Sequence, residues 1–377
     1  MHQPFRTISL AATLTLAACG GAAAPSTAPV APPSSGASPS TAPKPAASAA
    51  SARPAASAGS SSSAAKPAAS GGSGAAAKPL SQAKITFALP INSGLQVLPQ
   101  VALDAGYFKD EGLDVSIISI PTSQNVIAAL QNGEIAMANS DSPSTVTAHL
   151  NGVNNLIIAV PVTKPIFDLM VPASITKPQD LKGKTVAISR VCDSTCFQVS
   201  RALTGWGMSP KDVNFLGVTD YTGMFAGLKT GQIAAAALPP PFNFQAEQQG
   251  FHSLADLSQL PIEYPTAVVQ TVRPFLDAHP DTTVAFLRAY VKAIARYKSD
   301  EAFMVETYKK FLKSDDVPVI QKTWEYYSRL LHDDPTPSAD GIQFVLETLA
   351  ETGTDKAKGA NPNEFIAPQY MQQALGK

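Results

Sequence analysis

Metal-ligand spacings, phosphate loops, basic surfaces and long apolar runs are all missing from this sequence, and each absence excludes a class of protein. The three cysteines and five scattered histidines form no standard zinc spacing. No phosphate-binding loop, G-x-S-x-G motif or dinucleotide fingerprint occurs. A formal net charge of -1 gives no basic footprint for nucleic acid. We therefore expect no metal, no cofactor and no nucleic-acid partner, and we find no motif of an enzyme.

Acidic residues are absent from the beginning of the chain, where the first carboxylate is Asp104. Residues 20–80 are almost entirely Ala, Ser, Pro and Gly with a few Lys and one Arg, and they include no aromatic residue. Such a segment cannot bury enough apolar surface to offset the entropy of ordering it. We expect residues 19–80 to form a disordered tether. The folded part then begins near Ala83 and has about 295 residues, a size suited to two lobes.

The N-terminus has the features of an export signal. Arg6 precedes a short apolar run, residues 8–18, that ends in small residues directly before Cys19. Since spanning a bilayer requires about 20 apolar residues, this run is typical of a signal peptide rather than a membrane helix. Leu16-Ala17-Ala18-Cys19 resembles the bacterial lipobox, whose cysteine is acylated after cleavage. We expect a signal peptide at 1–18 and an exported chain anchored to the membrane through lipid on Cys19. The alternative is an ordinary signal peptide with an incidental cysteine.

Strand-like and helix-like segments alternate from residue 84 onward, which indicates an α/β fold with mostly parallel sheets. The pattern predicts strands at 84–89, 113–120, 134–138, 154–160, 184–188, 212–217 and 232–237, and helices at 94–105, 123–131, 143–150, 195–206, 222–229 and 241–249. Beyond Val272 the pattern is helical, with helices predicted at 280–298, 301–313, 317–331 and 338–351.

Two segments of the chain, 129–138 and 227–236, match each other. Each reads as a helix end, a glycine suited to the left-handed conformation, and a buried strand. The match favours two similar α/β lobes. The alternative is that such junctions recur in any α/β protein.

Residues 104–115 (Asp-Ala-Gly-Tyr-Phe-Lys-Asp-Glu-Gly-Leu-Asp-Val) resemble a signature of the SsuA/Thi5-like branch of periplasmic binding proteins, which serves sulfonates, taurine, nitrate and thiamine-precursor pyrimidines. Residues 180–187 and 205–213 and the two matching segments follow in the family's order, so the resemblance covers about residues 83–300. It implies a type II periplasmic binding protein, in which two lobes close over a ligand by a hinge motion. Its implied divisions are lobe one at 81–172, lobe two at 173–265, and a return to lobe one with C-terminal helices at 266–377. The two crossover segments would lie near 169–171 and 267–269.

The same resemblance implies a function and its partners. A monomer of this class takes a small molecule and delivers it to the permease and ATPase of an ABC importer. Two alternatives remain open. One is a pyrimidine-precursor enzyme on the same fold, although the cysteine-rich iron motif of those enzymes is absent here. The other is a lipoprotein that senses a ligand without transporting it.

Candidate ligand contacts follow from the rule that ligands bind beyond the carboxyl ends of strands in α/β lobes. Polar or aromatic residues follow the predicted strands at these positions, although Ser, Thr and Asp there also cap helices. The candidates are Asn92, Ser93, Ser123, Gln124, Ser140, Asp141, Arg190, Asp193, Ser194, Thr195, Asp220, Tyr221, Thr222, Pro240 and Phe242.

The loop at 190–196 departs from the pattern of anion-binding relatives. If Asp193 caps the following helix, its carboxylate occupies the position that an anionic ligand would take. Arg190 would either restore the attraction or pair with Asp193. The loop therefore favours a neutral or amine-bearing ligand over sulfonate or nitrate. A heterocycle stacked on Tyr221, Phe225 or Phe242 would fit this description.

Cys192 and Cys196 form an even pair in a chain that we expect to be exported, which favours a disulfide. Neighbours at this spacing on one helix have Cβ atoms about 5–6 Å apart, whereas a disulfide needs about 3.8 Å. A bridge therefore requires Cys192 to precede the helix. Two free thiols are the alternative, and metal binding is a third.

Overall fold

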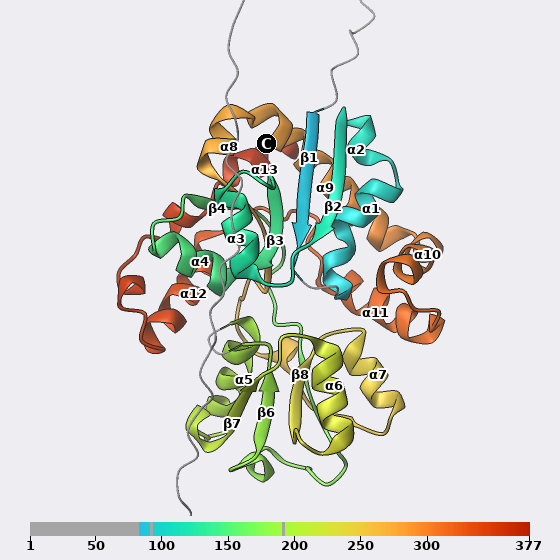
Figure 1. Cartoon of the computed structure of the whole chain (residues 1–377), viewed down its shortest axis with the longest axis vertical. Coiled ribbons are helices and arrows are strands. Elements are labelled where there is room, and N and C mark those ends of the chain that lie inside the picture. The colour runs from blue at the N-terminus through green and yellow to red at the C-terminus, as the bar shows by residue number, and fades with distance from the viewer. Residues whose placement is uncertain (1–82, 91–92, 191–192) are drawn as a thin grey trace, which may run out of the picture. The chain divides into compact units, whose positions relative to one another are not determined.

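A computed structural model describes residues 83–90, 93–190 and 193–377 of the protein. These residues build two five-stranded sheets with helices packed on them (Figure 1). The first sheet, in lobe one, has the spatial order β2 (Leu113–Ser119), β1 (Ala83–Leu89), β3 (Met137–Asp141), β10 (Ala267–Val272) and β4 (Asn155–Val162). The second, in lobe two, has the order β7 (Asn214–Gly217), β6 (Thr185–Ile188), β8 (Ala235–Leu238), β5 (Asp168–Val171) and β9 (His252–Asp256). The predicted two-lobe α/β class is confirmed.

Both sheets mix parallel and antiparallel pairing. β1 is parallel to β2 and β3, and β6 is parallel to β7 and β8. By contrast, β10 is antiparallel to β3 and β4, and β5 is antiparallel to β8 and β9. Four of the five strands in each sheet therefore run in one direction, and the fifth, β10 or β5, runs against them. β5 and β10 run the other way because each arrives from the opposite lobe, at the edge where the parallel strands end.

The crossovers lie a few residues before the positions that the family resemblance implies. Asp168–Val171 is already paired in the second sheet, and Ala267–Val272 is paired in the first. The linking segments are therefore 163–167 and 257–266, and lobe two begins before residue 173. The apolar residues at 169–171 and 267–269 are therefore buried residues of strands β5 and β10, because the chain enters its new sheet directly after each linking segment.

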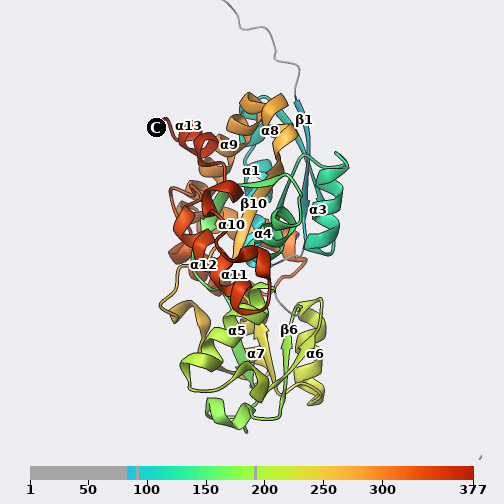
Figure 2. The ribbon, with the colours of Figure 1, turned by 90° about the vertical axis from the view of Figure 1, so that its left-hand side faces the viewer.

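Helices α1 (Leu98–Asp104), α2 (Tyr107–Asp110), α3 (Ser123–Gln131) and α4 (Ser142–Leu150) belong to lobe one, and α5 (Ser194–Gly205), α6 (Tyr221–Thr230) and α7 (Phe242–Gln248) to lobe two. The C-terminal part forms α8 (Arg273–Ala278), α9 (Pro280–Ser299), α10 (Glu301–Leu312), α11 (Val317–Leu330), α12 (Ala339–Glu351) and α13 (Pro368–Ala374). Most of these pack on lobe one (Figure 2): α9 lies against α1 and α13, and α12 against α4. Of these six, the pattern missed the short helices α8 and α13. Among the described helices, none has the length and apolar character that crossing a membrane requires.

The matching segments occupy equivalent places in the two lobes. Gly133 and Gly231 both adopt the left-handed conformation, with φ of 72° and 71°. Each is followed by a central strand in the same register: Met137 lies opposite Phe87 in the first sheet, and Ala235 lies opposite Val186 in the second. The internal match therefore reflects two lobes built from the same unit.

The family-like signature at 104–115 serves the packing of lobe one. The ring of Phe108 stacks on Phe286 of α9 at 5.0 Å. Glu111 receives Arg288 and Lys292 of α9, each at 2.7 Å. The signature thus joins the turn before β2 to the long helix α9.

Candidate ligand-binding site

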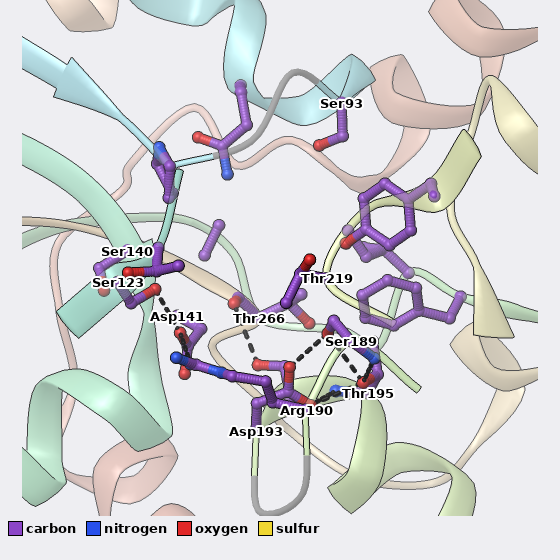
Figure 3. Close-up of a pocket in the computed structure, with 18 of the residues that line it drawn as sticks. Ser93, Ser123, Ser140, Asp141, Ser189, Arg190, Asp193, Thr195, Thr219 and Thr266 are labelled. Carbon is purple, nitrogen blue, oxygen red and sulfur yellow. Dashed lines mark hydrogen bonds and ion pairs between the residues drawn. The ribbon is translucent and has the colours of Figure 1, made fainter. Parts of the chain in front are cut away.

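One pocket collects residues from both lobes and from both crossovers. It lies where the parallel strands of the two sheets end, and its volume, open solvent at the mouth included, is about 700 Å³. Its lining residues are Pro90, Ser93, Gln96, Pro121, Thr122, Ser123, Ser140, Asp141, Ile166, Phe167, Ser189, Arg190, Asp193, Ser194, Thr195, Thr219, Tyr221, Thr266 and Ala267. Hydroxyl groups dominate its polar surface (Figure 3).

Four helices begin where strands end, and a side chain caps each of them. Thr122 accepts a hydrogen bond from the main chain of α3 (3.2 Å), and Asp141 accepts one from α4 (2.8 Å). Asp193 accepts two from α5 (2.9 and 3.1 Å), and Asp220 accepts one from α6 (2.6 Å). Thr122, Asp141 and Asp193 also line the pocket. The capping and site-lining roles of these residues therefore coincide.

Asp193 is the most enclosed charged group of the pocket, with 6% of its surface exposed. Its carboxylate accepts hydrogen bonds from the hydroxyls of Ser189 and Thr195 (Figure 3). Burial raises the pKa of Asp193, and the nearby charge of Asp141 raises it further, against the effect of these hydrogen bonds. The pocket thus contains a carboxyl group whose charge is costly to maintain.

Arg190 reaches from lobe two to lobe one across the pocket (Figure 3). Its guanidinium lies 4.0 Å from the Asp141 carboxylate and donates to the hydroxyl of Ser144 at 3.2 Å. Ser123 donates to the same carboxylate at 2.7 Å. Of the two roles considered for Arg190, pairing with Asp193 is not what the structure shows, because its partner is Asp141.

The remaining walls combine buried polar groups with apolar ones. Gln96 accepts a hydrogen bond from the buried Asn139. The hydroxyl of Ser140 has no partner within the described residues, although the residue is only 1% exposed. The rings of Phe167 and Tyr221 lie 6.3 Å apart and form an aromatic wall. Burial raises the pKa of Tyr221, so its hydroxyl stays neutral at physiological pH.

The structure brings together nine of the candidate residues from the sequence: Ser93, Ser123, Ser140, Asp141, Arg190, Asp193, Ser194, Thr195 and Tyr221. It places four others outside this pocket. Gln124, Asp220 and Thr222 are exposed at the starts of α3 and α6, and Phe242 packs behind Tyr221 at 5.3 Å.

Pro240 is also absent from the pocket wall. Its carbonyl accepts a hydrogen bond from the main-chain N–H of Gly94 at 3.2 Å. Phe225, a candidate for stacking, packs against Phe251 instead. Asn92 lies outside the described residues. Ligand contact by any of these side chains stays a prediction.

Sequence reasoning missed several lining residues. Ser189 and Thr219 follow β6 and β7 closely, so the strand-end rule could have found them. Gln96 stands in an apolar stretch and gave no signal. Ile166, Phe167 and Thr266 belong to the crossovers, which the sequence placed a few residues too late.

The cysteine predictions remain untested. Cys19 and Cys192 lie outside the described residues, and Cys196 is buried in the first turn of α5. Within the described ranges, no group of three or more His, Cys, Asp or Glu side chains is arranged to hold a metal ion.

Two similar lobes, two crossovers and a pocket between the strand ends define a two-lobe solute-binding protein. The chain belongs to the NMT1/THI5-like family, whose model matches residues 99–300. It is 26% identical to the taurine-binding periplasmic protein of Escherichia coli K12 over 282 residues, which are 71% of this chain and 87% of that protein. It is 23% identical to the putative binding protein YtlA of Bacillus subtilis, over 74% of this chain and 85% of that protein.

Solved structures show the same fold. The periplasmic aliphatic sulphonate binding protein SsuA of Escherichia coli superposes with a TM-score of 0.63 at 18% identity, over 76% of this chain and 92% of that one. The periplasmic nitrate-binding protein NrtA of Synechocystis PCC 6803 superposes with a TM-score of 0.64 at 16% identity, over 78% and 89%. The resemblance predicted from the sequence is confirmed.

Proposed function

We propose that this protein is an exported lipoprotein that captures a small organic molecule in the pocket between its lobes and delivers it to an ABC importer. The observation that carries the proposal is the composition of the pocket wall. Ser140 and Asp141 come from lobe one, Asp193 and Tyr221 from lobe two, and Thr266 from a crossover. A ligand that contacts both lobes stabilises the arrangement in which the lobes are together, which is the basis of hinge closure.

The location and partners belong to the same proposal. Acylation of Cys19 would hold the chain at the membrane, and residues 19–80 would separate the lobes from the lipid. The relatives named above are periplasmic or binding proteins, which supports a binding role rather than a catalytic one. The partners are then the permease and ATPase of the importer, and the protein acts as a monomer. Mass spectrometry of the chain purified from membranes tests the anchor, because Cys19→Ala should lose both the acyl mass and the membrane fraction.

A thermal-shift panel on the full chain tests ligand capture. The panel contains taurine, other sulfonates, nitrate, aminopyrimidines, thiamine, aromatic acids and amino-acid derivatives. A ligand that binds only the folded state adds about 2.7 kcal/mol of stability at one hundred times its dissociation constant. We expect at least one compound to raise the unfolding midpoint.

Two exposed threonines provide a matched pair of variants. Thr219 lines the pocket, and Thr222, three residues along, does not. Thr219→Trp should abolish the ligand-induced shift by filling the mouth, whereas Thr222→Trp should leave it intact. If no compound in the panel shifts the midpoint, or if the shift survives Thr219→Trp, the proposal that this pocket captures the solute is wrong.

A further inference from the structure

Two helix N-termini at the pocket, those of α4 and α5, are already occupied by carboxylates of the protein. Main-chain N–H groups at a helix start commonly bind anions. In α5 these groups, at Thr195 and Cys196, already donate to the carboxylate of Asp193. In α4 the N–H of Ser144 donates to Asp141. An anion at either position would have to displace a carboxylate of the protein itself.

The side-chain charges of the pocket also disfavour an anionic ligand. Arg190 is the basic residue among the described lining residues, and Asp141 and Asp193 are the acidic ones. The guanidinium of Arg190 is already engaged with Asp141 and Ser144. With both carboxyl groups ionised, the lining has an excess of one negative charge, which favours a cationic partner.

Two buried oxygen atoms, one from each lobe, have unused capacity to accept hydrogen bonds. Asp193 receives three hydrogen bonds on Oδ1 but only one, from Ser189, on Oδ2. In lobe one the hydroxyl of Ser140 is buried on the pocket wall with no partner among the described residues. A buried polar group without a partner costs about 1–3 kcal/mol, so the hydroxyl of Ser140 indicates a polar ligand atom. This observation is independent of the helix caps.

We propose that the ligand presents a protonated amine to Asp193 and Ser140 and lays an apolar or aromatic body against Phe167 and Tyr221. The inference rests on the proposed function and specifies the ligand class of the same site. An ammonium group has three donors and no acceptor, so its chemistry matches the oxygen acceptors that Asp193, Ser140 and Asp141 place on the pocket wall. Because these oxygens belong to both lobes, the amine would link ligand recognition to closure.

The proposal also gives a pH signature. The charged or titratable groups facing Asp193 are Asp141, Arg190, Tyr221 and Tyr264. Burial and the charge of Asp141 raise the pKa of Asp193. A bound ammonium favours the ionised carboxylate. Amine affinity should therefore rise as the pH increases through this pKa, and it should fall again when the ligand amine loses its proton. An anionic ligand would show the opposite trend, with affinity falling as Asp193 ionises.

Calorimetry on the full chain with three probes of one shape tests the class. The probes are 2-phenylethylamine, 2-phenylethanol and 2-phenylethanesulfonate, which share the phenylethyl body and carry a cationic, a neutral and an anionic head group. We expect the amine to bind at least about tenfold more tightly than the alcohol, because a hydrogen bond to a charged group contributes about 1.5–3 kcal/mol. We expect no binding of the sulfonate.

Two aspartate caps give a matched pair of variants. Asn caps helices about as well as Asp, so Asp193→Asn removes the charge and keeps α5 capped. It should weaken amine binding about tenfold and remove the rise with pH. Asp220→Asn makes the same change at the cap of α6, outside the pocket, and should leave amine binding unchanged.

Three results would overturn the amine inference: no binding of the amine, tighter binding of the sulfonate, or amine affinity unaltered by Asp193→Asn. The proposed function is tested separately. If a sulfonate that has no amine, or nitrate, raises the unfolding midpoint and Thr219→Trp removes the effect, capture by the pocket stands and only the amine inference fails. If no small molecule shifts the midpoint, both fail.

Discussion

Gly94 occupies a contact between the two lobes that has no room for a side chain. A Cβ atom there would lie 2.5 Å from the ring of Tyr327 and 2.6 Å from a methyl group of Thr323, both on α11. It would also lie 3.1 Å from the carbonyl oxygen of Pro240 in lobe two. That carbonyl accepts hydrogen bonds from the N–H of Gly94 (3.2 Å) and the hydroxyl of Tyr327 (3.3 Å). Neither neighbour can move freely, because Tyr327 and Thr323 are fully buried.

We therefore predict that Gly94→Ala lowers the free energy of unfolding by about 1–3 kcal/mol, the usual cost of overpacking a filled core. The substitution should also weaken ligand binding, because it pushes apart groups that join the lobes. Urea unfolding measures the first effect as a lower midpoint with an unchanged slope. Calorimetry with the ligand that the thermal-shift panel identifies measures the second.

Gly205 provides the control. It is the last residue of α5, and a Cβ atom there would meet nothing within 4 Å. Gly205→Ala should stabilise the chain by about 0.4–1 kcal/mol, because it reduces the freedom of the unfolded state without strain. The reasoning from contacts is refuted if Gly94→Ala is as stable as the parent chain, or if the two substitutions have the same effect.

Two further predictions concern charged groups. Burial raises the pKa of Asp168 from 3.8 to about 6, although Ser253 and Asn243 donate hydrogen bonds to it. The folded state therefore holds this proton more tightly, and between about pH 4 and pH 6 stability should fall with rising pH by about 3 kcal/mol from this group alone. Urea unfolding at pH 4, 5, 6 and 7 should show this slope in the parent and not in Asp168→Asn; parallel curves would contradict it. Burial also acts to raise the pKa of Glu111, but Lys292 and Arg288 outweigh it and lower the pKa. Since both partners are about half exposed, Glu111→Gln should cost no more than about 1 kcal/mol, and less at 1 M salt. A larger, salt-independent loss would show that packing, not charge, is the main contribution of Glu111.

The sequence predicted most elements of the fold because their apolar patterns are regular. The helix expected at 123–131 is α3 with the same bounds, and the glycines at 133 and 231 adopt the expected conformation. The pattern predicts no strand at β5, β9 or β10, which the structure contains, and it misplaces the third strand. That strand was predicted at 134–138 from its apolar residues but runs from Met137 to Asp141. Pairing with β10 keeps the chain extended through the polar residues Asn139, Ser140 and Asp141, and no apolar pattern marks such an end.

The candidate site was predictable where one residue both ends a strand and caps a helix. Asp141 combines these roles and lines the pocket, and Asp193, which caps α5 a few residues after β6 ends, lines it as well. Asp220 has the same local pattern but lies outside, because pocket walls depend on how two lobes meet rather than on local sequence. Gln96 shows the converse: it lies among apolar residues that predict core, yet it pairs with Asn139 beside the ligand space.

The capping residues have a consequence for how such proteins diversify. Asp, Asn and Ser cap a helix about equally well, and Thr only slightly less, so exchanging Asp for one of the others changes the charge beside the pocket while the helix keeps its cap. At Asp193, such an exchange would alter the electrostatics experienced by a solute while α5 keeps its start. The fold can therefore be conserved while substitutions at the cap change which charge of solute the pocket accepts.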